Sequence, residues 1–315
     1  MSISVIQWGT GNVGQAALRS VLEHDNYELV GCYVSSPSKV GVDAADFVGL
    51  PACGVKATSD INEILNLKAD VVLHMPLSAA QVNEDPAKDT KDICALLRSG
   101  KNVVTTVGYV YPKAYGADVL RELEDACAVG GVSLHGTGVN PGFMAELVPL
   151  IFTSHSQSIK SILVREHSNF SFYASPQIIF DVMGFSLAPE AYEEHTARYR
   201  KWLSGLFEES VLMMADGLGL ALDELTVESE VELATEDISI AINVMEYAKT
   251  TNPNDEIVEE LEAPKPKAQP AVQQKSVSVD LGGTSDISGD LPWEKEEAPK
   301  QKDDVASAFD DLFNN

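Results

Sequence analysis

Basic residues are scarce in this 315-residue chain. Lys and Arg number 22 against 48 Asp and Glu, and the formal net charge at pH 7 is −26. A surface of that sign repels phosphate backbones and anionic membranes, so nucleic acids and polybasic membrane docking are not expected. Long apolar runs are lacking as well, since no stretch approaches the roughly 18 residues that a membrane helix needs. The first residues, MSISV, do not resemble a secretory leader, so we expect a cytoplasmic protein.

Cysteine is equally sparse. The four cysteines stand far apart and form no C-x-x-C pair, so a zinc ribbon, a thioredoxin-like motif and a disulfide framework are not expected. The chain also lacks an H-E-x-x-H motif and clustered carboxylates that would suggest a metal. These absences predict four reduced thiols and no metal site.

The first 140 residues contain an alternation of short apolar runs with helical patterns. Strands that alternate with helices indicate βαβ units and a parallel, doubly wound sheet, that is, an α/β fold of the Rossmann type. Continuous apolar strands fit a sheet that is covered on both faces. Strands are predicted at residues 3–8, 28–34, 69–75, 102–106 and 132–135, and helices at 13–22, 61–67, 90–98 and 117–129.

Beyond residue 140 the pattern changes, which predicts a Rossmann domain over 1–140 and a smaller α+β substrate domain over 141–250. Residues 246–315 carry 16 acidic and 7 basic side chains, and their composition predicts a disordered acidic tail over 251–315. Within the tail, Val305, Phe309, Leu312 and Phe313 lie on one helical stripe, either a partner-binding helix or a frayed end. In the second domain, helices are predicted at 143–152, 176–183 and 189–218, and strands at 159–167 and 224–233.

The strongest motif is the G-x-G-x-x-G sequence at residues 9–14, which directly follows the first predicted strand and opens a helix. The first glycine allows the tight turn, the second leaves room for a pyrophosphate, and the third lets helix and strand pack closely. The helix N-terminus then offers N–H groups to the phosphates. The predicted cofactor-binding residues of this loop are Gly9, Thr10, Gly11, Asn12, Val13 and Gly14.

The choice between NAD and NADP is made at the end of the second strand, where an acidic residue would bind the ribose 2′-hydroxyl of NAD. The chain instead reads SSPSK, and the hydroxyls of Ser35 and Ser36 with the ammonium of Lys39 suit a 2′-phosphate. The sequence therefore favours NADP slightly. The alternative is that these residues form a solvated loop and that both cofactors bind.

Three further loops follow predicted strands and should meet at the same edge of the sheet. Met75 and Pro76 are predicted to line the cofactor path, whereas His74 is expected to be a core histidine. Tyr109 and Tyr111 are the catalytic candidates, because their hydroxyls can exchange hydrogen bonds near a reacting carbon; packing would also explain one of them.

The last of these loops contains Asn140, whose amide suits a nicotinamide carboxamide and could also cap a helix before Pro141. An apolar pocket with a few polar groups is the usual form of a small-ligand site. The predicted substrate residues are His135, Phe143, Phe172 and Tyr173.

Six segments resemble the 2,4-diaminopentanoate dehydrogenase / native amine dehydrogenase group, whose N-terminal domain is similar to dihydrodipicolinate reductase. They are VIQWGTGNVGQAALRSVL, SSPSKVGVDAADFVGLPACGV, ADVVLHMPLS, SGKNVVTTVGYVYP, HGTGVNPGFMAELVPL and SPQIIFDVMGF. The resemblance covers about residues 3–235. It implies NAD(P)-dependent interconversion of a small amine with an imine, or with a ketone plus ammonia, and a homodimer is expected.

The chain departs from this group in two places. The resemblance implies an amine-holding carboxylate in the loop after the fifth strand, but that loop reads VGYVYP. It also implies further strands after residue 233, where this chain continues into ATEDISIAINVMEYAKTT and the tail, so a shortened second domain is expected. Two alternatives therefore remain: reduction of a C=O or C=N bond with a tyrosine as proton donor, or a cofactor-binding scaffold.

Overall fold

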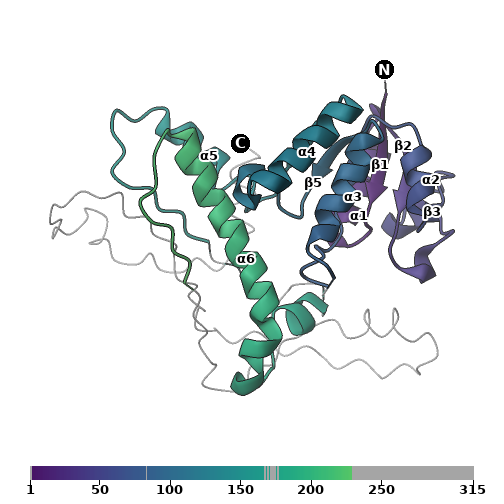
Figure 1. Ribbon diagram of the computed structural model, residues 1–315. Helices are drawn as coiled ribbons and strands as arrows, with labels where there is room; N and C mark the ends of the chain where they lie inside the picture. Colours follow the sequence, from purple (N-terminus) through teal and green to yellow (C-terminus); the bar gives the residue numbers. More distant parts are fainter. Residues whose placement is uncertain are drawn as a thin grey trace, which may run out of the picture. The chain divides into compact units, whose positions relative to one another are not determined.

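The computed structural model describes residues 2–82, 84–166, 168, 170, 175 and 177–228, all within the first of the chain's two units, Met1–Val279. Six parallel strands form one sheet in the order β3-β2-β1-β4-β5-β6 (Figure 1). The order reverses between β1 and β4, so the loops that follow these strands flank the point where doubly wound sheets bind ligands. The strands are β1 (Ile3–Trp8), β2 (Tyr27–Tyr33), β3 (Ala57–Thr58), β4 (Val71–His74), β5 (Asn102–Thr105) and β6 (Leu134–Gly136).

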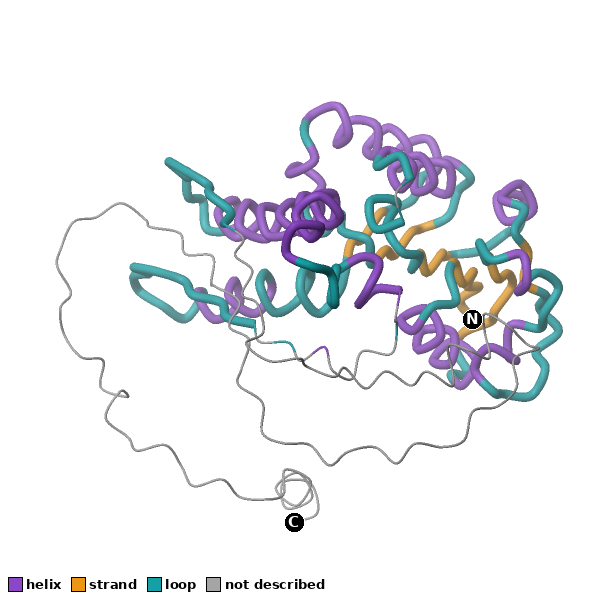
Figure 2. Tube along the Cα trace, turned by 90° about the horizontal axis from the view of Figure 1, so that it is seen from below, coloured by secondary structure: helices purple, strands orange, loops and turns teal. Residues whose placement is uncertain are grey.

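Four helices complete the βα units: α1 (Asn12–Glu23), α2 (Ile61–Asn66), α3 (Ala87–Arg98) and α4 (Ala117–Gly130). One apolar core joins α2, α3 and α4 to the central strands through buried side chains such as Ile64, Leu96 and Leu123. A second core packs Leu18 of α1 against Cys32 and its neighbours. The strands of Figure 2 (orange) accordingly run between helices (purple), and the predicted doubly wound parallel sheet is confirmed.

The elements after the sheet are helical: α5 (Leu147–Thr153), the π-helix η5 (Gln177–Val182) and α6 (Pro189–Gly217). Short 3₁₀ turns, η1 (Pro37–Lys39), η2 (Ala44–Val48) and η3 (Pro112–Tyr115), lie in the loops of the βα units. None of the helices in the described part of the chain is long and apolar enough to cross a membrane. The domain limits at residues 140 and 250 stay predictions.

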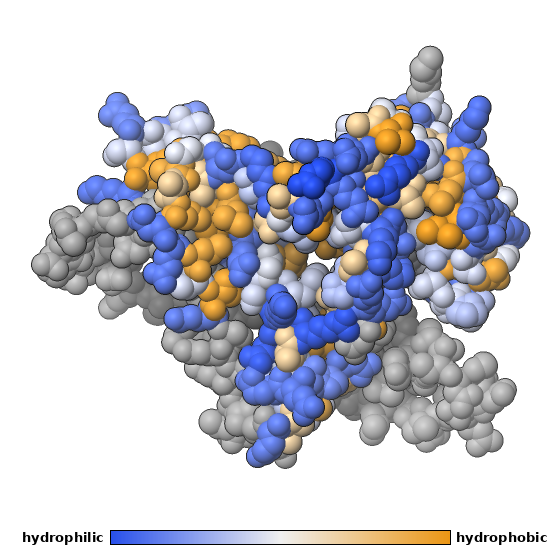
Figure 3. Space-filling view, in the orientation of Figure 1, coloured by the Kyte–Doolittle hydropathy of each residue, from blue (hydrophilic) through white to orange (hydrophobic). Residues whose placement is uncertain are grey.

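Helix α5 exposes most of its apolar side chains. Ile151 and Phe152 are 58% and 69% exposed, and Figure 3 shows apolar surface (orange) where α5 lies beside the C-terminal end of α6. Contiguous apolar surface on a folded protein is commonly an interaction surface. The other large apolar residues that are exposed in the described residues after β6 are Val139, Phe143, Met144, Leu147, Leu163, Phe185 and Leu220.

The predicted strand at residues 159–167 is wrong, because residues 159–166 lie in no strand. An alternating pattern produces a strand only where a neighbouring strand completes its hydrogen bonds, and no described strand runs beside this segment. Residues 224–228 of the other predicted strand also lie in no strand, and its remainder lies outside the described residues. The predicted α+β character of the second domain is therefore not seen in its described part, where helices are the only regular elements.

The helix predicted at residues 143–152 begins only at Leu147, after a series of turns. Gly142, with φ +128°, breaks the helical path, and its N–H donates to the side chain of Glu146. The predicted helix at 176–183 is the π-helix η5, and the one at 189–218 is α6. The sequence also missed β3, whose two residues are too few to show a pattern.

Candidate functional site

The glycine loop lies between β1 and α1, and two of its glycines are required by the backbone around them. Gly9 has φ +94°, and a Cβ there would lie 2.6 Å from the carbonyl oxygen of Met75. A Cβ on Gly14 would lie 2.1 Å from the carbonyl oxygen of Gly9. Gln7 stabilises the turn, since its Nε2 donates to the Gly9 carbonyl at 2.8 Å. Backbone of the glycine loop and of the loop after β4 therefore requires glycine at both positions of the tight passage from strand to helix.

Gly11 differs, because no atom lies within 4 Å of the Cβ it would carry. It is the N-cap of α1, no side chain caps the helix there, and the first turn contains no acidic residue. Gly11, Asn12 and Val13 are all exposed. A helix N-terminus carries about half a positive charge and N–H groups without helical partners. This open end fits the pyrophosphate of a dinucleotide, as the sequence predicts.

Lys39 folds back onto the glycine loop. Its Nζ donates to the carbonyl oxygen of Thr10 at 3.1 Å and to the Thr10 hydroxyl at 3.0 Å, and burial lowers the pKa of Lys39. Ser35 is exposed, and the hydroxyl of Ser36 lies 2.9 Å from that of Ser38. A cation and hydroxyls thus stand near the loop at the end of β2.

Asp43 is the first carboxylate in the sequence after β2, and its oxygens already accept hydrogen bonds within the protein. Its oxygens accept N–H groups from Ala45, Cys53 and Gly54 at 3.0–3.1 Å. These hydrogen bonds hold the pKa of Asp43 at about 2, so it organises the loop before β3. Its side chain is therefore engaged away from any ribose hydroxyl.

The loop after β4 lies directly against the glycine loop. The N–H of Met75 donates to the carbonyl of Trp8 at 2.8 Å, and a Cβ on Gly9 would lie 3.1 Å from the nitrogen of Pro76. The structure thus brings Met75 and Pro76 together with Gly9. His74 is buried, its Nδ1 lies 2.9 Å from the hydroxyl of Thr105, and burial lowers its pKa to about 3. It is a neutral core histidine.

The loop after β5 contains two residues with left-handed backbone, Gly108 at φ +110° and Tyr109 at φ +60°. Tyr109 is buried, its hydroxyl lies 2.8 Å from that of Thr90 on α3, and its ring stacks on Tyr115. Burial raises the pKa of Tyr109. Its hydroxyl is therefore engaged with α3 inside the protein.

Tyr111, the other predicted catalytic tyrosine, has a more open hydroxyl. It donates to Oδ2 of Asp216 at 2.6 Å, and Nζ of Lys113 donates to the same oxygen at 2.7 Å. Lys113 and Asp216 are both exposed. The sequence predicted neither partner. A Lys two residues from a candidate Tyr was a weak local signal, and Asp216 lies near the C-terminal end of α6.

Two buried carboxylates connect α6 and α5 to these loops. Oε1 of Glu209 on α6 accepts the Tyr111 N–H at 2.6 Å, and Oε2 accepts the Tyr115 hydroxyl at 3.2 Å. Glu146 accepts the Gly142 N–H at 2.7 Å and the hydroxyl of Ser210. Burial is the main reason that the pKa of Glu209 rises to about 7, and the nearby charge of Glu146 adds to it.

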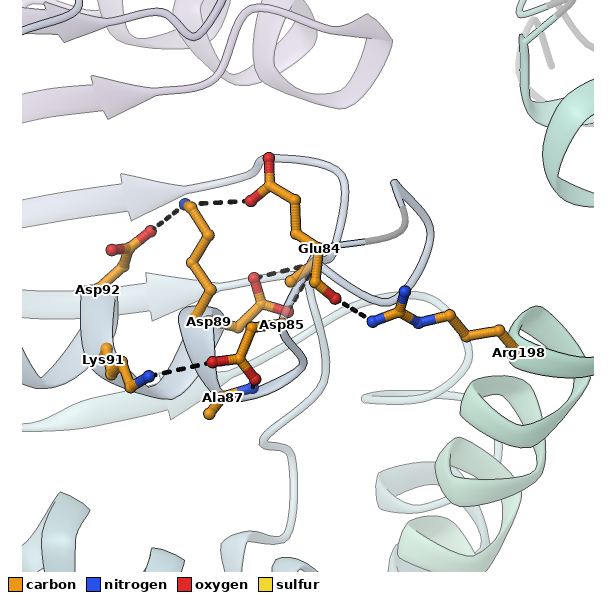
Figure 4. Close-up of polar contacts among 9 residues, drawn as sticks. Glu84, Asp85, Ala87, Asp89, Lys91, Asp92 and Arg198 are labelled. Carbon is orange, nitrogen blue, oxygen red and sulfur yellow. Dashed lines mark hydrogen bonds and ion pairs between the residues drawn. The ribbon is translucent and has the colours of Figure 1, made fainter.

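The loop between β4 and α3 also contacts α6 (Figure 4). The guanidinium of Arg198 donates to the carbonyl oxygen of Glu84, and Lys88 lies between Glu84 and Asp92. Asp89 accepts the Ala79 N–H, and burial raises its pKa to about 6. One helix, α6, therefore makes polar contacts with the loops after β4 and β5 and with Glu146, which holds the loop after β6.

The loop after β6 brings Asn140 to Glu166, to whose carboxylate the Asn140 amide donates. Asn140 does not cap α5, because that helix begins at Leu147. Gly136 touches the loop after β5, since its Cβ would lie 2.2 Å from the carbonyl of Tyr109. Of the predicted substrate residues, His135 and Phe143 are exposed, and Phe172 and Tyr173 lie outside the described residues.

Among the described residues, no group of three or more His, Cys, Asp or Glu side chains is placed to hold a metal ion. All four cysteines are free. The positively charged group closest to the glycine loop is the ammonium of Lys39, 3.0 Å from Thr10. The arrangement can therefore bind an anionic dinucleotide across the carboxyl edge of the sheet and place a reacting group near the loops after β5 and β6.

Comparison with known proteins connects this arrangement to a family. Residues 3–106 match the family described as dihydrodipicolinate reductase, N-terminus. An amine dehydrogenase from Streptomyces virginiae is 32% identical over 233 residues, covering 72% of this chain and 62% of that protein. A 2,4-diaminopentanoate dehydrogenase from Acetoanaerobium sticklandii is 25% identical over 240 residues, covering 74% and 65%. The predicted resemblance is confirmed, and the chain spans less than two thirds of the length of these relatives.

The fold has a counterpart among solved structures. The structure of an amine dehydrogenase from Mycobacterium smegmatis matches with a TM-score of 0.58 at 18% identity, covering 76% of this chain and 69% of that one. At that identity the likeness concerns the fold alone. It supports the Rossmann-like assignment of the parallel sheet.

Proposed function

We propose that the chain is an NAD(P)H-dependent oxidoreductase that acts on a C–N bond of a small molecule. The observation that carries the cofactor is the glycine loop, where Gly9 and Gly14 are fixed by close backbone contacts and Gly11 faces open space. The observation that carries the bond type is the 32% identity to an amine dehydrogenase over 233 residues. The reaction is the reduction of a carbonyl with ammonia to an amine, or its reverse.

The residues proposed to hold the cofactor are those the structure assembles along the carboxyl edge of the sheet. Gly11, Asn12 and Val13 offer the N-terminus of α1 to the pyrophosphate, and Met75 and Pro76 line the path beside Gly9. The nicotinamide ring, when bound, supplies or accepts the hydride. Asn140 is proposed to contact its carboxamide, which requires the Asn140 amide to leave Glu166 or to share its hydrogen bonds.

NADP is proposed as the preferred cofactor. The support is the ammonium of Lys39 beside the hydroxyls of Ser36 and Ser38, together with the engagement of Asp43 by three backbone N–H groups. A phosphate gains charge-assisted hydrogen bonds from such a cluster. A ribose hydroxyl would find no free carboxylate there.

Tyr111 is proposed to manage the proton of the reaction, because its hydroxyl lies on a surface that a substrate can reach and is bonded to Asp216 beside Lys113. Tyr109 is the weaker candidate, since its hydroxyl is buried against Thr90. In the net reduction, the carbon gains one hydride, nitrogen replaces oxygen, and water leaves as one proton is consumed. The chain contributes by orienting the reactants and by holding water away from them.

The experiment is NAD(P)H oxidation with a panel of small ketones in the presence and absence of ammonia, followed by the reverse reaction with the matching amines. Oxidation that requires ammonia supports the C–N reaction. Ketone-dependent oxidation without ammonia points to the second candidate, a C=O reductase. Tight cofactor binding without any turnover would favour the scaffold alternative.

The remaining expectations on partners are also proposals. We propose a homodimer, since the described surface includes exposed Leu147, Ile151 and Phe152, the kind of surface that dimers bury; light scattering measures the mass directly.

The partner-binding stripe at residues 303–313 lies outside the described residues. Deletion of that segment, followed by comparison of the captured proteins, tests it, and the cytoplasmic location stays a prediction.

A further inference from the structure

Glu209 is a fully buried carboxylate that the proposed reaction leaves without a role. It lies on the face of α6 that also carries the buried Leu206 and Ser210, and its partners all belong to the loop after β5. Oε1 accepts the Tyr111 N–H at 2.6 Å, and Oε2 accepts the Tyr115 hydroxyl at 3.2 Å. The Tyr115 hydroxyl oxygen in turn accepts the Tyr109 N–H at 3.1 Å. One carboxylate thus serves the backbone N–H groups of Val110 and Tyr111 directly and that of Tyr109 through a hydroxyl.

This loop needs such support. Tyr109 adopts φ +60°, a conformation that a residue with a Cβ rarely takes. Backbone in this state persists only when its surroundings determine it. The surroundings are close: a Cβ on Gly108 would lie 2.3 Å from the Tyr115 hydroxyl and 3.6 Å from Oε2 of Glu209. The conformation of residues 107–111, and with it the position of the Tyr111 side chain, depends on this packing.

The protonation of Glu209 decides how the network is connected. As a carboxylate, Glu209 can only accept, which matches the N–H and O–H donors that face it. Among the described residues, ionisable groups that interact with Glu209 include Tyr109 and Tyr115 of the loop and Glu146 at the start of α5, and none of these three is a cation. Burial and the charge of Glu146 raise its pKa to about 7, so it takes up a proton near neutral pH. Once Oε2 carries a proton, the Tyr115 O–H loses the acceptor to which it donates.

We propose that Glu209 is a positioning residue for the proposed reaction: as a carboxylate it holds residues 107–111 in the shape that presents Tyr111 to the substrate, and uptake of a proton loosens that loop. The inference rests on the proposed function for its catalytic consequence. Its structural half, the ordering of the loop by one carboxylate, stands without it.

The test compares the wild type, Glu209→Gln, Glu209→Ala and the control Glu208→Gln. Glu208 is exposed on the same helix and loses the same charge on substitution. In Glu209→Gln, the neutral amide imitates the protonated carboxyl: its oxygen still accepts the Tyr111 N–H, but its nitrogen cannot accept the Tyr115 hydroxyl. The loop should therefore exchange at every pH as the wild type does at pH 6. Glu209→Ala leaves the buried N–H of Tyr111 without its acceptor.

Two readouts are used on the full chain. Hydrogen exchange of the peptide covering residues 105–116, corrected for the intrinsic effect of pH, is expected to be about tenfold faster at pH 6 than at pH 8 in the wild type and in Glu208→Gln. It should be independent of pH in Glu209→Gln and fast throughout in Glu209→Ala. For turnover with saturating NADPH, kcat should fall below pH 7 in the wild type, be lower but independent of pH in Glu209→Gln, and fall at least tenfold in Glu209→Ala with little change in KM for the cofactor.

The possible outcomes distinguish a failure of loop positioning by Glu209 from a failure of the proposed function. If wild-type exchange of residues 105–116 does not change between pH 6 and pH 8, or if Glu208→Gln behaves like Glu209→Gln, the inference is refuted whatever the activity. If exchange follows the expectation but no substrate turns over, the positioning of the loop stands and the proposed function fails. Should Glu209→Ala not fold, Glu209→Gln alone carries the comparison.

Discussion

Replacing Gly11 by Ala should weaken cofactor binding and leave folding almost unchanged. Gly11 has φ −77° and ψ −172°, which alanine adopts without strain, and no atom lies within 4 Å of the new Cβ. The gain of about 0.4–1 kcal/mol from a stiffer unfolded chain roughly offsets the loss of about 1 kcal/mol from a poorer N-cap. The net change in the free energy of unfolding should therefore stay within about 0.5 kcal/mol.

The same methyl group projects into the space proposed for the pyrophosphate. Forcing a methyl against a well-fitted group costs about 1–3 kcal/mol, which corresponds to NADPH binding about 5- to 150-fold weaker. Gly14→Ala should behave in the opposite way, because its Cβ would lie 2.1 Å from the Gly9 carbonyl oxygen. Backbone must move there, and we expect the fold to lose at least about 1–3 kcal/mol.

The assay pairs urea unfolding with titration of NADPH fluorescence. Gly205→Ala is the matched control, since it lies within α6 with no atom within 4 Å of its Cβ and should gain about 0.5–1 kcal/mol from helix propensity without affecting the cofactor. A Gly11→Ala protein that unfolds normally and binds NADPH as tightly as the wild type would refute the placement of the phosphates. A Gly14→Ala protein of unchanged stability would refute the close packing of Gly14 against the Gly9 carbonyl.

Three further variants test single contacts. Lys39→Ala should weaken NADPH at least tenfold, the value of a lost hydrogen bond to a charged group, and NADH no more than about twofold; equal losses in parallel titrations would place the ammonium at the pyrophosphate instead. His74→Asn should reduce acid sensitivity, because the folded-state pKa of His74 is lowered to about 3. Between pH 6.5 and pH 3 only the unfolded chain binds that proton, so the free energy of unfolding decreases as the pH is lowered, by up to about 1.4 kcal/mol per pH unit. A variant that loses as much stability as the wild type between pH 7 and pH 4 contradicts this. Lys101→Ala should cost about 1.5–3 kcal/mol in denaturant unfolding, since the buried ammonium donates to the carbonyl of Leu65 at the end of α2; a loss below about 0.5 kcal/mol would show that the contact contributes little.

The sheet and its glycine loop could be predicted from the sequence because their signals are local. The G-x-G-x-x-G pattern stands within six residues, and Gly9 and Gly14 are required by atoms of that same loop and of the adjoining one. The strands of the βα units are apolar runs bounded by turns, and each predicted strand has a counterpart in the sheet. Here the local preference and the global fold agree, which is the condition under which sequence reasoning succeeds.

The second part of the chain shows the limit of the same reasoning. Alternation of apolar and polar side chains at residues 159–167 is the pattern of a half-exposed strand, yet residues 159–166 pair with nothing among the described strands. Alternation describes which side chains prefer burial; it does not supply the neighbouring backbone. A strand exists only where another strand accepts and donates its hydrogen bonds.

The polar contacts of α6 could not be predicted from the sequence for a related reason. Glu209 lies 98 residues from Tyr111, and Asp216 lies 105 residues from the hydroxyl that it accepts. A glutamate beside another glutamate on a long helix is normally an exposed charge. The one available signal was its position three residues after Leu206 and one before Ser210, on the face that the helix buries. A buried charge on an apolar face requires partners, and among the described residues the loop after β5 provides them for Glu209. The residues that shape the candidate site are therefore of two kinds: a local motif proposed to bind the dinucleotide, and a helix distant in the sequence, α6, proposed to position the loop after β5.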